Sequence, residues 1–150
     1  MSPRAAWRLE EIGFTSVYHY VAGKADWGSF GLPLEGKADS RTRVGSIIRT
    51  DAPTCRPDEL VATVAERVDE WPICVVTNVE GVVLGLLGRQ ALCSAESVRA
   101  DQAMSLGPST IRPSARRDAI ARRMRDQNLT SIVVTRSDGT LAGVVRREDL

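Results

Sequence analysis

Hydrophobic residues follow a helical period and then a strand pattern after residue 57. The helical positions are Leu60, Val61, Val64, Ala65 and Val68. Because they fall on one face at 3.6 residues per turn, they predict an amphipathic helix. The next stretch, VVTNVEGVVLGLL at 75–87, consists of two apolar runs around the turn residues NVEG. It predicts two strands joined by a tight turn.

The same order returns in the last third of the chain. TCRP at 54–57 matches TIRP at 110–113 with an offset of 56, and VVTRSDGTLAGVV at 133–145 matches residues 75–87 with an offset of 58. Since proline is tolerated in the first turn of a helix, we expect a helix to begin at each x-R-P piece. The second helix keeps part of the apolar stripe at Ala115, Ile120 and Met124.

Each copy therefore predicts strand, helix, strand, strand and helix, the last helix lying at RQALCSAES, residues 89–97, in the first copy. A unit this small cannot bury its own sheet. The two copies are expected to pack on each other.

Residues 1–36 precede the repeats and have a different pattern. SPRAAWRLEEIGF predicts an amphipathic helix with Ser2 as N-cap and Pro3 in its first turn. TSVYHYV predicts a strand, in which His19 is a strand residue rather than a base. AGKADWGSFGLP predicts a loop with a short helix, and the polar EGKADSRTR at 35–43 predicts a linker.

Composition and charge exclude several classes of protein. The 150 residues are 43% hydrophobic and carry a formal net charge of +1, whereas bulk nucleic-acid binding needs a strong basic surplus. No apolar run approaches the roughly 20 residues that span a bilayer, and MSPRAAWRLE lacks the apolar core of a signal peptide. We therefore expect a cytoplasmic globular protein that binds neither nucleic acid nor membrane.

The three cysteines, Cys55, Cys74 and Cys93, are interpreted as small buried hydrophobes. Each lies beside Val, Ile or Leu, where a free cysteine usually has this role. They form no CxxC pair and His19 is the only histidine, so no metal site is predicted. No residue is assigned as catalytic.

Over residues 44–150 the chain resembles a tandem pair of CBS (cystathionine-beta-synthase-type) domains. The resemblance is carried by IIRTDAPTCRPDELVATVAERV with CVVTNVEGVVLGLLGRQAL, and by AMSLGPSTIRPSARRDAIARRM with SIVVTRSDGTLAGVVRREDL. It implies an α/β fold with mixed sheets. Two β-α-β-β-α units, at 44–97 and 98–150, would pack as a pair, the second without its terminal helix. A helix-strand-helix extension and linker, residues 1–40, would precede them.

The resemblance also implies a regulatory module rather than an enzyme. Such pairs bind adenine nucleotides or related adenosyl compounds between the repeats, so AMP, ADP, ATP or S-adenosylmethionine is the expected regulatory ligand, and no cofactor is required. The regulated protein is unknown.

One ligand site is expected, at the second repeat. In the family the last strand runs into a Gly-h-x-Thr/Ser-x-x-Asp pattern, whose Asp binds the ribose hydroxyls and whose hydroxyl residue contacts phosphate. Asp149 matches the ribose position, and Arg146 replaces the hydroxyl residue with a guanidinium that can fork onto phosphate. The remaining nucleotide-binding positions implied are Val145, Thr110, Ile111, Ser131 and Ile132.

The first repeat has Gly88 and Ala91 at the hydroxyl and carboxylate positions, so no site is expected there. Two alternatives stay open. Asp149 either binds ribose or only caps a helix that follows it, as Asp often does. The pair as a whole is either a ligand sensor or an interaction and dimerisation module whose clefts have decayed.

The extension resembles the C-terminal third of a rhodanese (sulfurtransferase) domain. The matching positions are Ser2, Ala5, Ala6, Gly13, Phe14, Trp27, Gly31 and Pro33. In that family the nucleophilic cysteine lies a few residues before the Ser, where this sequence has only Met1. Because a persulfide mechanism needs a thiolate, the segment is interpreted as a structural remnant.

Charge is distributed unevenly between the repeats. Residues 51–100 hold four arginines and eight acidic residues, a net charge of −4, whereas residues 101–150 hold nine arginines and six acidic residues, a net charge of +3. CBS-type pairs commonly dimerise through their helices. A head-to-tail homodimer would place opposite charges together, and it is therefore the expected assembly.

Overall fold

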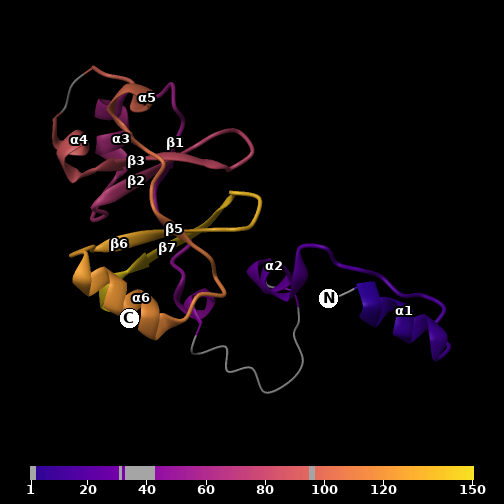
Figure 1. Cartoon of the computed structure of the whole chain (residues 1–150). Helices are drawn as coiled ribbons and strands as arrows, with labels where there is room; N and C mark the ends of the chain where they lie inside the picture. Colours follow the sequence, from indigo (N-terminus) through magenta and orange to yellow (C-terminus); the bar gives the residue numbers. More distant parts are fainter. Residues whose placement is uncertain (1–2, 31, 33–42, 95–96) are drawn as a thin grey trace.

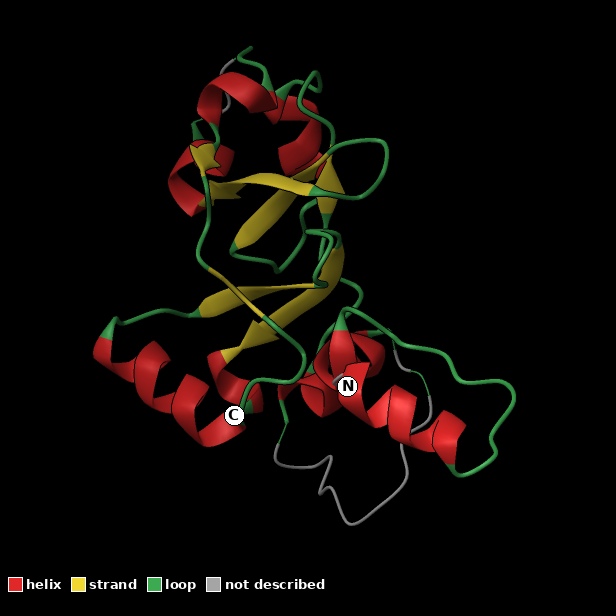
Figure 2. Ribbon diagram, turned by 45° about the vertical axis from the view of Figure 1, so that its right-hand side comes forward, coloured by secondary structure: helices red, strands yellow, loops and turns green. Residues whose placement is uncertain are grey.

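Two β-sheets lie face to face and carry helices on their outer sides (Figure 1, Figure 2). The computed structural model describes residues 3–30, 32, 43–94 and 97–150. The strands are β1 (Thr54–Cys55), β2 (Ile73–Thr77), β3 (Val83–Gly88), β4 (Ser105–Leu106), β5 (Thr110–Ile111), β6 (Ser131–Thr135) and β7 (Leu141–Arg146). The helices are α1 (Pro3–Glu11), α2 (Gly23–Ser29), α3 (Val61–Arg67), α4 (Arg89–Cys93), α5 (Ala100–Ala103) and α6 (Arg117–Asp126), with 3-10 turns η2 (Val44–Ile47) and η3 (Arg147–Asp149). The predicted α/β class with mixed sheets is confirmed.

The two sheets, ordered β1-β2-β3-β4 and β5-β6-β7, follow the repeat. β1 is parallel to β2, which forms an antiparallel hairpin with β3, and β5, β6 and β7 pair in the same way. Both hairpin turns close with a 3.0 Å hydrogen bond, from Gly81 N–H to the Asn78 carbonyl and from Gly139 N–H to the Arg136 carbonyl. These glycines have φ values of 80° and 87°, which side-chain-bearing residues rarely adopt.

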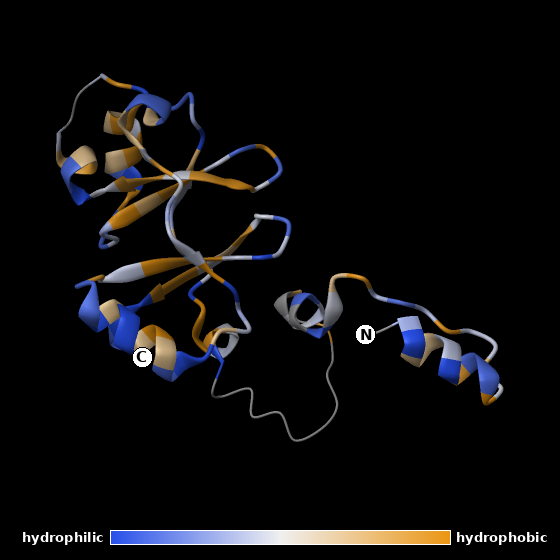
Figure 3. Ribbon diagram, in the orientation of Figure 1, coloured by the Kyte–Doolittle hydropathy of each residue, from blue (hydrophilic) through white to orange (hydrophobic). Residues whose placement is uncertain are grey.

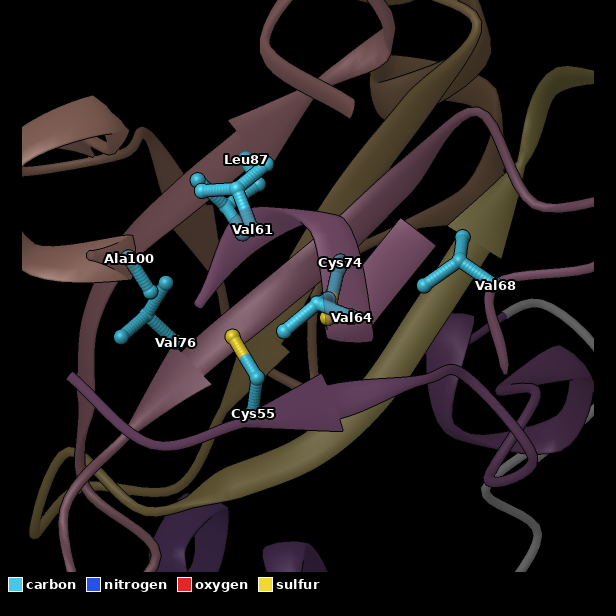
Figure 4. Packing of buried hydrophobic residues seen from close by; sticks show 8 residues of the cluster. All are labelled: Cys55, Val61, Val64, Val68, Cys74, Val76, Leu87 and Ala100. Atoms are coloured by element: carbon cyan, nitrogen blue, oxygen red, sulfur yellow. The ribbon is translucent and has the colours of Figure 1, made fainter. Parts of the chain in front are cut away.

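Buried side chains form three layers. In β2, Cys74 and Val76 belong to the core under the first-repeat helices, whereas Val75 faces the other sheet together with Val133. Side chains alternate along a strand, so burial on both faces requires the continuous apolar runs of β2 and β6. Figure 3 shows this concentration of hydrophobic residues on the strands. The first-repeat core, seen in Figure 4, comprises Cys55, Val61, Val64, Val68, Cys74, Val76, Leu87 and Ala100.

The leading segment of each repeat crosses to the sheet of the other repeat. Arg49 exchanges two backbone hydrogen bonds of 2.8 and 2.9 Å with Val144 of β7, and Val44 is buried in the second-repeat core. Conversely, β4 pairs with β3, and Ala100 is buried in the first-repeat core. The predicted units, 44–97 and 98–150, follow the sequence repeat. In the structure, the first residues of each unit pack on the sheet of the other unit.

The arginine of each x-R-P piece holds the end of a strand. Arg56 donates from Nη1 to the carbonyls of Thr77 and Asn78. Arg112 donates from Nη1 to the carbonyl of Thr135 at 3.1 Å, to its Oγ1 at 2.8 Å and to the carbonyl of Arg136. Both guanidiniums thus satisfy carbonyls at the start of a hairpin turn, a structural role that explains the repeated arginine.

Two local predictions are wrong. Residues 15–21 form no strand and have no ladder partner among the described residues; Tyr18 is 86% exposed. An unpaired strand leaves its backbone groups unsatisfied, so an alternating pattern alone does not make one. The helices after the x-R-P pieces begin at Val61 and Arg117, four residues after each proline, because the prolines open a turn instead.

The N-terminal extension contains the two predicted helices, α1 and α2. α1 buries none of its residues, and its Trp7 is 58% exposed. Its predicted N-cap, Ser2, and most of the predicted linker lie outside the described residues. Within the described ranges, no helix is long and apolar enough to cross a membrane.

Candidate functional site

The predicted site lies where β6 begins and β7 ends. Ser131 and Arg146 are cross-strand neighbours in the antiparallel register of this pair. The chain then turns into η3, which brings Glu148 and Asp149 back toward the strand ends. Thus two residues far apart in the repeat, Ser131 and Arg146, come together as the resemblance implies.

Asp149 caps the start of η3. Its Oδ2 accepts the backbone N–H of Arg146, the N-cap residue, at 3.3 Å. Asp149 thus caps the turn to which it belongs, not a helix that follows it. The cap uses one oxygen, Oδ2, so it does not by itself exhaust the carboxylate.

Arg49 occupies both oxygens of the same carboxylate. Its Nε donates to Oδ2 of Asp149 at 2.9 Å and its Nη2 to Oδ1 at 2.6 Å, although the two residues are 100 positions apart. The Asp149 side chain retains 18% exposure and that of Arg49 36%. The hydrogen bonds from Arg49 lower the pKa of Asp149 below its ordinary value and raise that of Arg49.

Glu148 links this ion pair to Arg146. Its Oε1 accepts from Nη2 of Arg49 at 3.2 Å and from Nη1 of Arg146 at 3.0 Å. The Arg146 guanidinium also lies over the ring of Trp71, 4.3 Å from its centroid, a cation–π contact that fixes its plane. Arg146 is therefore held from both repeats, since Trp71 precedes β2 of the first.

A cavity of about 550 Å³ opens beside this network, between the two repeats. Its lining contains three arginines and two glutamates, an excess of one positive charge, and consists of Glu70, Pro72, Arg89, Thr130, Ser131, Arg146, Arg147 and Glu148. Among the described residues, Oγ of Ser131 and Nε of Arg146 are buried polar atoms without a hydrogen-bond partner. Such atoms are rare in native proteins and mark a place where a ligand or ordered water belongs.

Of the predicted binding residues, only Ser131 and Arg146 line this cavity; Asp149 follows the lining residue Glu148 but is not part of the lining. Val145, Ile111 and Ile132 are buried in the second-repeat core. Thr110 lines a different cavity, of about 350 Å³, together with Arg112 and the turn at Ser137–Gly139. Alternation along the strands accounts for this, because a position next to a site residue points to the opposite face.

The first repeat lacks the corresponding groups. Gly88 is the N-cap of α4, and Ala91 packs against the first-repeat core. Ser105 pairs with Leu86 of β3 in the way that Arg49 pairs with Val144 of β7, so the position equivalent to Arg49 is a serine. The Arg–Asp pair therefore exists in one half of the pseudosymmetric molecule only.

Several residues of the site were not found from the sequence, among them Arg49, Trp71 and Arg89. Arg49 belongs to the crossing segment, and Trp71 and Arg89 belong to the first repeat. Each contributes to a site of the second repeat only because the repeats pack together. No periodicity or motif within one repeat carries that information.

Comparison with known proteins agrees with this architecture. Residues 100–150 match the family model of the CBS domain. The cytosolic domain of the Mg²⁺ channel MgtE, in a complex with ATP, has a TM-score of 0.65 and 20% identity, and covers 73% of this chain and 47% of its own. CBSX2 in complex with AMP has a TM-score of 0.66 at 17% identity, covering 71% of this chain and 91% of its own.

A third structure is the CBS domain pair of protein MJ0100, in complex with 5′-methylthioadenosine and S-adenosyl-L-methionine. Its TM-score is 0.64 at 17% identity, covering 72% of this chain and 91% of its own. The fold is that of a CBS-domain pair. No curated protein matches the chain.

The CBS pair accounts for only part of some relatives. This chain spans about half the length, 47%, of the MgtE cytosolic domain. The structural matches cover about three-quarters of this chain or less, and the family model begins at residue 100. The rhodanese resemblance of residues 1–40 stays a prediction.

Proposed function

We propose that this CBS pair is a regulatory module that binds an adenine nucleotide or a related adenosyl compound between its repeats and catalyses no reaction on it. The observation that carries the proposal is the arginine-lined cavity with the unpartnered Ser131 Oγ and Arg146 Nε. Relatives of the same fold were solved with ATP, AMP and S-adenosyl-L-methionine, which supports an adenosine ligand.

A phosphate group suits the chemistry of this cavity. Its oxygens would accept from Arg146 Nε and Ser131 Oγ, removing the cost of two buried unpaired donors. Arg89 and Arg147 add positive charge on the lining, and guanidiniums bind phosphate through paired N–H groups. Asp149, which follows the lining residue Glu148, is the residue that the family resemblance assigns to the ribose hydroxyls.

Calorimetric titration with adenosine, AMP, ADP, ATP and S-adenosylmethionine tests the proposal. Asp149→Ala should weaken every one of these ligands by about 1.5–3 kcal/mol, because each contains the ribose. Arg146→Ala should weaken ADP and ATP more than adenosine, because only phosphate uses the guanidinium. Arg8→Ala, which removes an exposed arginine on α1, is the matched control and should bind as the wild type does.

An interaction and dimerisation module is the second candidate. It is favoured by one observation, that the Asp149 carboxylate is already occupied by Arg49. In that case none of the five ligands would bind, and an assembly through the repeats would be the function. Absence of binding to a folded wild-type protein, together with a stable homodimer, would select this candidate.

We also propose that residues 1–40, which resemble part of a rhodanese domain and contain no cysteine, have no sulfurtransferase activity of their own. The described cysteines all lie in or after β1.

A further inference from the structure

The ion pair between Arg49 and Asp149 joins two parts of the chain that the repeat places in different units. Arg49 lies in the segment that crosses onto the second sheet, where its backbone is fixed by two hydrogen bonds to Val144. Its side chain reaches past the end of β7 and binds both carboxylate oxygens of Asp149. The crossing segment thus places the Arg49 guanidinium at the carboxylate that is proposed to bind ribose.

A guanidinium and a ribose diol can each donate two hydrogen bonds to one carboxylate. Nε and Nη2 of Arg49 present two N–H donors to Oδ2 and Oδ1. A vicinal diol presents two O–H donors to the same pair of oxygens, at a similar separation. The carboxylate lone pairs that face the donors serve one or the other, so the two partners compete.

We propose that Arg49 is an internal plug of the ligand site, which a nucleoside must displace from Asp149 before its ribose can bind. This inference rests on the proposed function, and it adds a residue that sets the affinity of the site from within the chain. Competition from Arg49 would weaken the apparent affinity of the site, so that a higher ligand concentration is needed to fill it.

The surroundings of Arg49 allow it to be displaced. Its side chain is 36% exposed, so its movement needs no opening of the core. Glu148 already accepts from Nη2 at 3.2 Å and is itself 61% exposed. When the ribose hydroxyls bind Asp149, Arg49 can therefore stay paired with Glu148 and is not left as an unpaired charge.

The first repeat shows that the crossing itself does not require this ion pair. β4 pairs with β3 through Ser105 and Leu106, with no charged pair at the positions equivalent to Arg49 and Asp149. Two equivalent crossings therefore form, one with the Arg–Asp pair and one without it. A purely structural reason for the pair would apply to both.

Adenosine titration of Arg49→Met tests the plug. The methionine keeps an apolar stem and removes the guanidinium. We expect adenosine and AMP to bind roughly three- to tenfold more tightly than to the wild type. Arg49→Lys, which has a single ammonium and cannot fork onto both oxygens, should give a smaller gain, and it replaces Arg49→Met if that variant does not fold.

A double-variant cycle separates the plug from other effects of residue 49. In the Asp149→Asn background the change at Arg49 should no longer alter adenosine affinity, because the group that it blocks is gone. Equal or weaker binding to both folded Arg49 variants, with wild-type binding intact, would overturn the plug alone. If neither the wild type nor the Arg49 variants bind any adenosyl ligand, the proposed function fails and the plug with it.

Discussion

The carbonyl oxygen of Arg49 lies over Gly143 so closely that a β-carbon at position 143 would be 2.3 Å from it. Gly143 also has a φ of 142°, a region that side-chain-bearing residues rarely adopt. In the first repeat, a β-carbon on the equivalent Gly85 would be 2.5 Å from the sulfur of Met104. In both repeats the glycine of the last strand is thus the place where the crossing segment from the other repeat lies against the sheet.

Gly143→Ala should therefore destabilise the protein by about 2–4 kcal/mol, since both the backbone conformation and the space exclude a β-carbon. Gly88→Ala is the matched control: Gly88 has a φ of −83° and no atom near the added carbon within 4 Å. It should change stability by less than about 0.5 kcal/mol. Urea denaturation of the two variants measures the difference, and equal unfolding free energies would contradict the crossing geometry.

Arg56→Ala and Arg112→Ala should each destabilise the protein, by about 1–2 kcal/mol for carbonyl acceptors that lose a charged donor. Because the two arginines hold equivalent hairpins, the effects should be similar. Thermal unfolding measures them, with Arg8→Ala as the surface control. A large loss for one arginine and none for the other would show that the hairpins are not held alike.

The stabilisation from Asp149 should depend on pH in the acid range. Arg49 lowers the pKa of Asp149 below its ordinary value of 3.8, so the folded state binds the proton less readily than the unfolded chain. The stabilisation is complete above about pH 3.8 and is lost as pH falls through the lower folded-state pKa. The unfolding free energies of the wild type and Asp149→Asn should differ at pH 7 and converge at acid pH. A difference that is the same at both pH values would show that the carboxylate charge does not contribute.

One cysteine should react readily with a thiol reagent in the folded protein. Cys55 and Cys74 are buried as expected, whereas Cys93 is exposed, so its interpretation as a buried hydrophobe is wrong. A hydrogen bond with Cys55, together with burial, raises the pKa of the Cys74 thiol, which keeps it protonated and unreactive. Labelling should modify one thiol in the native state and three in urea. Rapid labelling of Cys93→Ser would place a second thiol at the surface.

Purified protein should also show no thiosulfate:cyanide sulfur transfer above a blank. Rhodanese chemistry needs an accessible thiolate, and the predicted extension has no cysteine. Turnover that disappeared in Cys55→Ser, Cys74→Ser or Cys93→Ser would show that the protein is a sulfurtransferase.

The protein should form a homodimer that salt weakens modestly. The −4 and +3 halves of the repeat region attract each other in a head-to-tail arrangement, and added salt screens charges at the surface. Sedimentation at rising salt concentration measures this. A monomer at every protein concentration would exclude the dimer, and a dimer pairing the basic halves would exclude the charge argument.

Local pattern was enough to determine the repeated unit. The apolar stripe of α3, the runs of β2 and β6 and the glycine turns each depend on residues close together in sequence, where helix and strand periods are visible. The resemblance named both Arg146 and Ser131, and the hairpin register then makes them neighbours across the strands. Local pattern failed at residues 15–21, where the pattern has no second strand among the described residues with which to pair.

Only the tertiary structure decided what surrounds the proposed ligand. Trp71 reaches Arg146, and Arg49 reaches Asp149, because the sheets pack face to face and the leading segments cross between them. Contacts between residues 75 and 100 positions apart leave no periodic trace in the sequence. The sequence by itself predicted Asp149 and Arg146 as binding residues, and the packing of the two repeats determined that Arg49 binds the Asp149 carboxylate.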